Sequence, residues 1–274
     1  RMLESLAMTV GVFLVAFMFA PIGMGGGMLF APLLHYVAGW PIDGTLLAMS
    51  LTLTWAVSIG SGLRHRRKGY HNDEATKVAL SGALLGALLG VAIVNVLGSG
   101  LDAVFKVLSI VMLVWALVKT KRKIERELHG AEGDEDGTQV AKIQTLHLRM
   151  GAGVGGALSS VLGVGAGVIY VPVLQQNAGL DARSSIGSSL AIMMLVVPVA
   201  ILTLLMTSDA GIVSTFANQP WWFFALPFVA YLGATSGATF GITKISTENI
   251  MKVFMALVAI VLVRYVADIA GLML

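Results

Sequence analysis

The sequence predicts an all-α polytopic membrane protein built from two homologous four-helix halves. Three observations predict this fold: the composition, the spacing of long apolar segments, and a glycine-rich motif that occurs once in each half. Of the 274 residues, 57% are hydrophobic and 12% are charged, and the mean hydropathy is +0.85. A water-soluble domain cannot bury so much apolar surface, and short alternating segments typical of a β-barrel are absent from the sequence.

The apolar segments divide the chain into two parts separated by charge. Residues 1–118 form the first expected transmembrane repeat, residues 119–141 a charged linker, and residues 142–274 the second repeat. The expected spans lie near residues 5–38, 44–63, 76–97, 101–118, 143–177, 184–206, 220–242 and 247–270. Duplicated membrane halves of this kind are typical of secondary transporters.

The repeat is visible residue by residue. Gly23, Gly25, Gly27 and Pro32 of the first half match Gly163, Gly165, Gly167 and Pro172 of the second. Two glycine ladders with a spacing of four residues follow, and we expect them to pack helices closely. The ladders are Gly82, Gly86 and Gly90 in the first half, and Gly233, Gly237 and Gly241 in the second.

The distribution of positive charge predicts the orientation. Basic residues gather at residues 64–77 and 119–149, and with Arg1 these regions hold 13 of the 18 Lys and Arg residues. If each half crosses the membrane four times, all of them lie on one side, which places the linker and both termini in the cytoplasm. The alternative is ten crossings, with each glycine-rich motif turning back as a hairpin. Because the basic residues flank apolar segments, a nucleic-acid partner is not expected.

The glycine-rich motifs interrupt their helices. Residues 6–36 as one straight helix would span roughly 46 Å, whereas the hydrocarbon core is about 30 Å thick. Pro21 through Gly27 can unwind, because glycine permits unusual backbone angles and proline lacks an amide donor. We call these motifs the two elbows. Unwound backbone at membrane depth must be packed in protein or line a cavity, so the elbows are expected to face inward, near the membrane midplane.

A helix that starts after a break offers free N–H groups and a partial positive charge, which suit an anion. Such half-helices are expected to begin near Met28 and Val168 and to face each other, next to hydroxyl side chains at residues 50–58 and 185–189. Glycines packing helices, and hydroxyls bonding only their own helix, are the alternative interpretation. The expected substrate-binding residues are Gly25, Gly26, Gly27, Ser50, Thr54, Gly165, Ala166, Gly167, Ser188 and Ser189. His35, Gln175 and Gln176 are expected to line the outer mouth of the pathway.

Several classes of function are excluded by what the sequence lacks. It contains no cysteine, no metal-binding motif such as H-E-x-x-H and no phosphate-binding loop, so we expect no cofactor, no metal site and no catalytic residue. No Asp or Glu falls in the centre of an expected span, which disfavours proton coupling through a buried acid. An intramembrane enzyme and a primary pump are therefore not expected.

The elbows "GMGGGMLFAPLL" and "GVGAGVIYVPVL", followed by "AMSL" and "GSSL", resemble the TauE/SafE family of sulfite exporters. The basic loop "RHRRKGY" and the glycine-ladder helix after it fit the same pattern. The resemblance implies a four-plus-four helical transporter of the bacterial or archaeal inner membrane. It also implies a small sulfur-containing anion as substrate, such as sulfite, thiosulfate or a sulfonate like sulfoacetate. Ala166 stands where the first elbow has Gly26, so the two half-sites differ.

The favoured function is secondary transport of such an anion by alternating access, with export as the expected direction. An anion moving out of a negative-inside cell gains roughly 2.3 kcal/mol per charge at 100 mV, so no coupling ion is required. A passive anion channel is the nearest alternative, and a membrane scaffold or assembly protein comes from a different class. The expected partners are the anion and the lipid bilayer, and the sequence leaves a homodimer open.

Overall fold

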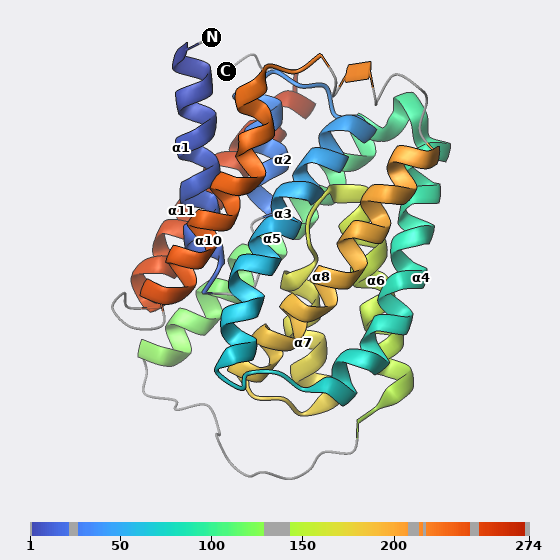
Figure 1. Cartoon of the computed structure of the whole chain (residues 1–274), viewed down its shortest axis with the longest axis vertical. Helices are drawn as coiled ribbons and strands as arrows, with labels where there is room; N and C mark the ends of the chain where they lie inside the picture. The colour runs from blue at the N-terminus through green and yellow to red at the C-terminus, as the bar shows by residue number, and fades with distance from the viewer. Residues whose placement is uncertain are drawn as a thin grey trace.

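The computed structural model is helical throughout the residues that it describes, which are 2–21, 27–128, 143–207, 214–215, 218–241 and 247–271. The helices in chain order are α1 (Met2–Phe19), α2 (Gly27–Tyr36), α3 (Gly44–Arg67), α4 (Asp73–Leu97), the short 3₁₀ turn η1 (Gly98–Gly100), α5 (Leu101–Leu128), α6 (Thr145–Leu162), α7 (Gly167–Ala178), α8 (Ala182–Thr207), the 3₁₀ turn η2 (Trp221–Ala225), α10 (Leu226–Gly241) and α11 (Thr247–Ile269). Figure 1 shows them as one bundle with α3 near its centre.

Within the described residues, four helical stretches are long and apolar enough to cross a membrane: Gly44–Arg67, Asp73–Arg122, Ala182–Thr207 and Trp221–Phe240. The second of these contains α4, η1 and α5, and the chain reverses direction at η1 (Figure 1). Large apolar side chains such as Leu85 and Leu89 are more than 60% exposed, as expected of a surface that contacts lipid. The chain is therefore a multi-pass membrane protein.

Polar caps define where the central helices begin. Asp43 Oδ1 accepts hydrogen bonds from the backbone N–H groups of Thr45 (2.9 Å) and Leu46 (3.0 Å) at the start of α3. Asn72 Oδ1 accepts from Ala75 N at 2.8 Å at the start of α4. Each cap satisfies donors that the first turn of a helix leaves unpaired, so the helix boundary is set by the sequence itself.

Both elbows turn the chain back on itself. Gln144 N, just before α6, donates to Asn177 O, near the end of α7, at 2.8 Å, so the two helices are antiparallel. Farther along the same hairpin, toward the elbow, Gly151 of α6 faces Val173 of α7. The first elbow repeats this arrangement, because a Cβ on Gly11 of α1 would lie 2.9 Å from Leu33 Cδ1 of α2.

The described helices therefore do not continue straight through the elbows, and the number of membrane crossings in each half stays a prediction. At the second elbow, Gly163 (φ 62°) and Ala166 (φ 50°) both adopt left-handed backbone angles on either side of Val164 and Gly165, and this pair of bends reverses the chain. Each half then has a hairpin followed by three long helices. The linker and the termini were expected on one side, but Figure 1 places the first turn of α1 and the last turn of α11 at one end and the end of α5 and start of α6 at the other.

Positive charge gathers at one of these ends. We call it the basic end; it is where α3 and α5 end and where α4, α6, α8 and α11 begin (Figure 1). The described basic residues near it are Arg64, Arg66, Arg67, Lys68, Lys77, Lys119, Lys121, Arg122, Arg149, Arg183 and Lys252. Lys106 and Arg264 are the described Lys and Arg residues nearer the opposite end.

The glycine ladders pack helices across the two halves. A Cβ on Gly82, Gly86 or Gly90 of α4 would overlap the carbonyl oxygens of Arg149, Gly153 and Ala157 of α6, respectively. The difference in residue number between the two partners is the same at all three contacts, so α4 and α6 run in the same direction with their backbones in contact. In the second half, a Cβ on Gly233 of α10 would lie 2.6 Å from Phe13 O of α1, and one on Gly237 would overlap Phe17 O. The packing interpretation of the ladders is confirmed for these five glycines.

The hairpin topology makes a prediction that differs from the four-crossing scheme. The chain has no cysteine, so single cysteines can be labelled without background. We expect Lys68→Cys and Ala182→Cys to react from the same side of the membrane, because both residues lie at the basic end, and Ser99→Cys to react from the other side. The four-crossing scheme places the loops around residues 98 and 181 together, so shared labelling of Ser99→Cys and Ala182→Cys contradicts the hairpins.

The ladder between α4 and α6 predicts an asymmetry between its two faces. Gly86→Ala should lower the melting temperature, because overpacking of a tight contact costs about 1–3 kcal/mol. Gly153→Ala, on the facing helix, should be neutral or stabilising, because its Cβ would meet nothing closer than Gly82 O at 3.4 Å and alanine favours helix over glycine. Thermal unfolding of both purified variants checks this, and equal melting temperatures would be contrary to the ladder.

Candidate functional site at the two elbows

The two elbows touch each other in the middle of the bundle. Gly27, the first residue of α2, faces the second elbow so closely that a Cβ there would lie 2.6 Å from Val164 Cα and 2.8 Å from Gly165 N. Two helices of opposite direction therefore begin at almost the same place, α2 at Gly27 and α7 at Gly167. The predicted starts near Met28 and Val168 are each correct to one residue. Gly25 and Gly26 lie outside the described residues.

α3 holds both elbows through its hydroxyl side chains. Ser50 Oγ donates to Gly163 O at 2.7 Å, at the start of the second elbow. Ser61 Oγ donates to Ala20 O at 2.7 Å, just after α1 ends and before the first elbow. Both bonds satisfy carbonyl groups that a terminating helix leaves without an intrahelical partner, so the breaks are stabilised by a neighbouring helix.

Thr54 lies between these two anchors, close to the midpoint of α3, and contacts both elbows. A Cβ on Gly27 would be 2.7 Å from Thr54 Oγ1, and Gly165 faces the Thr54 methyl group and Met193 Sδ. Thr54 is fully buried, yet Oγ1 has no hydrogen-bond partner among the described residues. A buried hydroxyl without a partner costs about 1–3 kcal/mol, so Thr54 is a candidate ligand-binding group.

Ser189 of α8 is a second hydroxyl of this kind. It stands in "GSSL" where Ser50 stands in "AMSL", and its Oγ is buried without a partner in the part of the chain that the structure describes. Ser58 behaves differently, because its hydroxyl donates to Thr54 O of its own helix at 2.8 Å. Of the three hydroxyls expected on this face of α3, only Thr54 is therefore available to a ligand, while Ser50 is committed to the second elbow.

The electrostatics of the meeting point favour a negative ligand without any charged side chain. α2, α7 and residues 44–63 of α3 contain no Asp, Glu, Lys or Arg. The first N–H groups of α2 and α7 lack intrahelical acceptors, and the helix dipoles place partial positive charge at both starts. Ala166 precedes α7 without a side-chain cap, so its position adds no competing acceptor. The arrangement can bind an anion through amides and hydroxyls.

The meeting point is closed in this conformation. A cavity beside it has room for about one water molecule, and it reaches from the start of α2 to the middle of α5. Its lining residues are Met28, Ser109, Met112, Leu113, Leu162 and Val164. An anion of three or more oxygens therefore requires the elbows or the α5 side to move.

Three of the remaining predicted residues lie at the basic end, away from the elbows. Ser188 Oγ accepts from Asn72 N at 3.0 Å, next to the loop between α3 and α4. Gln175 and Gln176 lie in the last turns of α7, near Asn177, which bonds the start of α6. The prediction that His35 and these glutamines share one mouth is wrong, because the second hairpin has the reverse direction of the first.

His35 lies at the opposite end, in a cluster that the sequence analysis missed. Tyr36 OH donates to Asp268 Oδ2 at 2.8 Å, and Lys106 Nζ is 3.5 Å from the same oxygen and 3.1 Å from Asp102 Oδ2. His35 Nε2 is 3.9 Å from Asp268 Oδ2. The cluster joins α2, α5 and α11, and no local pattern predicts it, because its members come from distant parts of the chain.

Tyr170 is a further residue that the sequence analysis did not identify. It lies one turn into α7, packed against Gly155 of α6, and its buried OH has no hydrogen-bond partner among the described residues. In the sequence it is an ordinary aromatic residue of an apolar run, and only the hairpin reveals that its hydroxyl is enclosed.

Comparison with known proteins identifies the family. The family model described as Sulfite exporter TauE/SafE matches residues 8–265. The chain belongs to the TauE/SafE family. Searches of the curated proteins and of the solved structures returned no significant match. The matched range includes both elbows, the glycine ladders and most of the Asp268 cluster.

Membership in the TauE/SafE family identifies the chain as a membrane transporter of sulfite-type anions. An anion with several oxygens accepts many hydrogen bonds and carries no donor of its own when fully ionised. Neutral donors bind it without the desolvation cost of a buried counter-charge.

The contact at Gly27 predicts a local and severe effect. Gly27→Ala should force the elbows apart, because the new methyl group would meet backbone atoms of Val164 and Gly165, and we expect loss of anion binding. Gly100→Ala is the matched control, since nothing lies within 4 Å of its Cβ and its φ is ordinary. Affinity and melting temperature are measured for both. A Gly27→Ala protein that binds the anion like the Gly100→Ala protein shows that the elbow contact is not part of the site.

Proposed function

We propose that this protein exports a small sulfur oxyanion or sulfonate, such as sulfite, thiosulfate or sulfoacetate, by alternating access at the elbows. The observation that carries the proposal is the convergence of two half-helix starts, Gly27 and Gly167, on the buried hydroxyl of Thr54, which has no hydrogen-bond partner among the described residues. These groups are donors with no charged neighbour on α2, α7 or residues 44–63 of α3. Such a site suits a compact anion with oxygens on several sides.

An inverted repeat is the proposed basis of the movement. α1 to α5 and α6 to α11 each consist of a hairpin and three long helices, and the two hairpins enter from opposite ends (Figure 1). The two halves contact each other in equivalent ways. α4 of the first half packs along α6, the first helix of the second half, and α10 of the second half packs along α1, the first helix of the first half. We infer six crossings and two re-entrant hairpins in place of eight crossings. Inverted repeats support alternating access by letting each half adopt the conformation of the other.

The basic end is proposed to face the cytoplasm, in the cell's inner membrane. Lys and Arg are enriched in cytoplasmic loops, and the described basic residues gather at this end. The first turn of α1 and the last turn of α11 then lie outside, which replaces the expectation of cytoplasmic termini. In this orientation a bound anion leaves toward the end that holds His35, and the membrane potential favours that direction.

The Asp268 cluster is proposed to close the outer side of the pathway. It ties the end of α2 to α5 and α11, and α5 also lines the cavity beside the elbows through Ser109 and Met112. Moving the α5–α11 pair away from α2 would therefore open the elbows toward the outside. This movement breaks the Tyr36–Asp268 hydrogen bond, so the cluster opposes outward opening.

Flux in proteoliposomes tests this function, with sulfite, thiosulfate, sulfoacetate, taurine and sulfate compared at one membrane potential. We expect saturable transport of at least one sulfur anion, and Thr54→Val should weaken its binding by roughly 1–3 kcal/mol, about 5- to 150-fold in Kd. The same substitution should raise the melting temperature of the ligand-free protein, because an unpaired buried hydroxyl is removed.

Ser58→Ala is the control, since that hydroxyl bonds its own helix. Flux that rises linearly with concentration would indicate a passive channel. An unchanged affinity of Thr54→Val in a folded protein would remove Thr54 from the site.

A further inference from the structure

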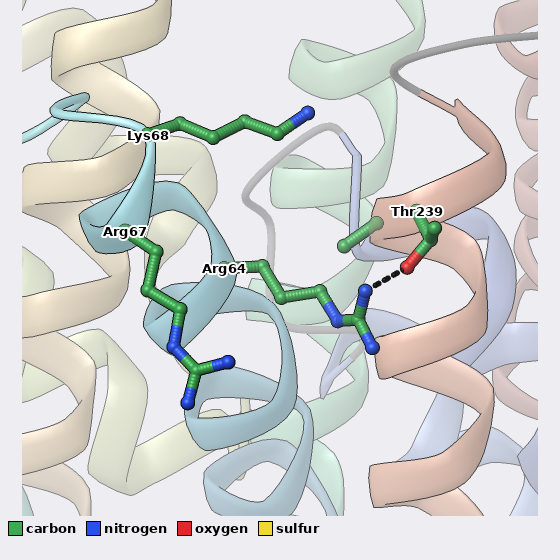
Figure 2. Close-up of a pocket in the computed structure, with 5 residues that line it drawn as sticks. Arg64, Arg67, Lys68 and Thr239 are labelled. Atoms are coloured by element: carbon green, nitrogen blue, oxygen red, sulfur yellow. Dashed lines mark hydrogen bonds between the residues drawn. The ribbon is translucent and has the colours of Figure 1, made fainter.

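A second concentration of anion-binding groups lies at the basic end, in a pocket between the last turns of α3 and α10. The pocket has about 190 Å³ of space, and Arg64, Arg67, Lys68, Ala238 and Thr239 line it. Figure 2 shows Arg64 extended from α3 toward α10, where its Nη1 donates to Thr239 Oγ1, while Arg67 and Lys68 extend from neighbouring positions of α3. Thr239 in turn donates to Thr235 O at 2.7 Å, which holds the acceptor in place.

Among the described residues, no carboxylate pairs with the cations of this pocket. None of the ion pairs between described residues includes Arg64, Arg67 or Lys68, and the pocket lining contains no acidic side chain within the described ranges. The carboxylate of Asp73, at the start of α4, is engaged by His71 at 2.7 Å. Three cations that share one recess repel each other, and an anion between them relieves that repulsion.

The pocket is also close to the start of the first elbow. Ser61, which donates to Ala20 O, precedes Arg64 by less than one turn of α3, a rise of about 4.5 Å. The backbone of Arg64 is therefore less than one helical turn away from the residue that bonds the end of α1. The pocket is separate from the meeting point of the elbows, because Thr54 lies about three turns of α3 before Arg64.

We propose that this pocket binds an oxyanion group, and that in transport it captures the sulfur anion from the cytoplasm before the anion enters the elbows. This role rests on the proposed export function, whereas the binding itself does not. A planar guanidinium pairs with two oxygens of one anion, and Arg64 is already oriented by Thr239. Charges arranged at an entrance raise the local concentration of the ligand in a salt-dependent way. The same chemistry would accept the phosphate of an anionic lipid headgroup.

Calorimetric titration with sodium sulfate at constant ionic strength tests the binding. The purified protein carries Thr54→Val, so that the elbow site is weakened and the pocket dominates. We expect Arg64→Gln to weaken sulfate binding by about 10- to 150-fold, the usual effect of losing a hydrogen bond to a charged group. Arg66→Gln is the matched control, because Arg66 lies on the same turn with its side chain exposed, removes the same charge and does not line the pocket. We expect it to leave the affinity unchanged.

Equal effects of Arg64→Gln and Arg66→Gln overturn the proposal, because binding would then follow net charge alone. If Arg64→Gln lowers the melting temperature, Lys68→Gln is measured in its place. An unchanged sulfate affinity of Lys68→Gln also counts against the pocket. Nanodiscs separate the two sources of the oxyanion. If phosphatidylglycerol competes with sulfate in the wild-type protein and not in Arg64→Gln, the pocket binds a lipid headgroup. If the sulfate affinity is the same in phosphatidylcholine with and without phosphatidylglycerol, the pocket binds the free anion.

The capture role has a separate readout in flux measurements. Arg64→Gln should raise the KM for export and leave the maximal rate nearly unchanged, with a weaker dependence of KM on salt than in Arg66→Gln. If no sulfur anion is transported by the wild-type protein, the export proposal fails, and sulfate binding that depends on Arg64 still stands. If export is measured and Arg64→Gln leaves its KM unchanged, the capture role fails alone.

Discussion

The contact between Gly27 and the backbone of Val164 and Gly165 is the constraint on which the rest of the structure depends. Two helix breaks at membrane depth leave backbone groups without intrahelical partners, and lipid cannot supply any. The fold solves this by placing the breaks against each other and against the hydroxyls of α3, where Ser50 and Ser61 each satisfy a carbonyl group. Any side chain at position 27 would separate them, so glycine is required there by close approach.

The glycine ladders and the elbows use the same residue for different purposes. Along α4 and α10, glycine lets a helix of one half contact the backbone of the first helix of the other half, and these contacts form a frame. At the elbows, glycine and the left-handed Ala166 permit the reversal of the chain. The frame involves α1 and α6, whereas α2 and α7 begin after the breaks and are joined to α3 and α8 by their own contacts.

Charge is arranged around this apolar centre in two separate groups. The Asp268 cluster contains both signs, and its internal pairs hold α2, α5 and α11 together. The described lining of the pocket at Arg64 contains only positive side chains and no acidic one. Between the two ends, neutral donors replace charges, because a fixed charge at the centre would carry a large desolvation cost and would hold its ligand too tightly to release. The described charges therefore suit capture at one end and closure at the other.

The sequence by itself determined the membrane class, the positions of both helix breaks and the packing role of the ladders. These properties follow from local composition and spacing, and the half-helix starts were correct to one residue. Tertiary structure decided the direction of the chain after each break, because a glycine-rich break permits both continuation and reversal. The reversal of the chain at each break places Gln175 and Gln176 at the end of the bundle opposite His35. Ser188 and Ser189 are both buried, but successive side chains on a helix point about 100° apart, so Ser188 Oγ accepts from Asn72 N whereas Ser189 Oγ has no hydrogen-bond partner among the described residues. Whether a hydroxyl is committed, like Ser50, or unpartnered, like Thr54, depends on which distant backbone atom lies beside it, and no local pattern contains that information.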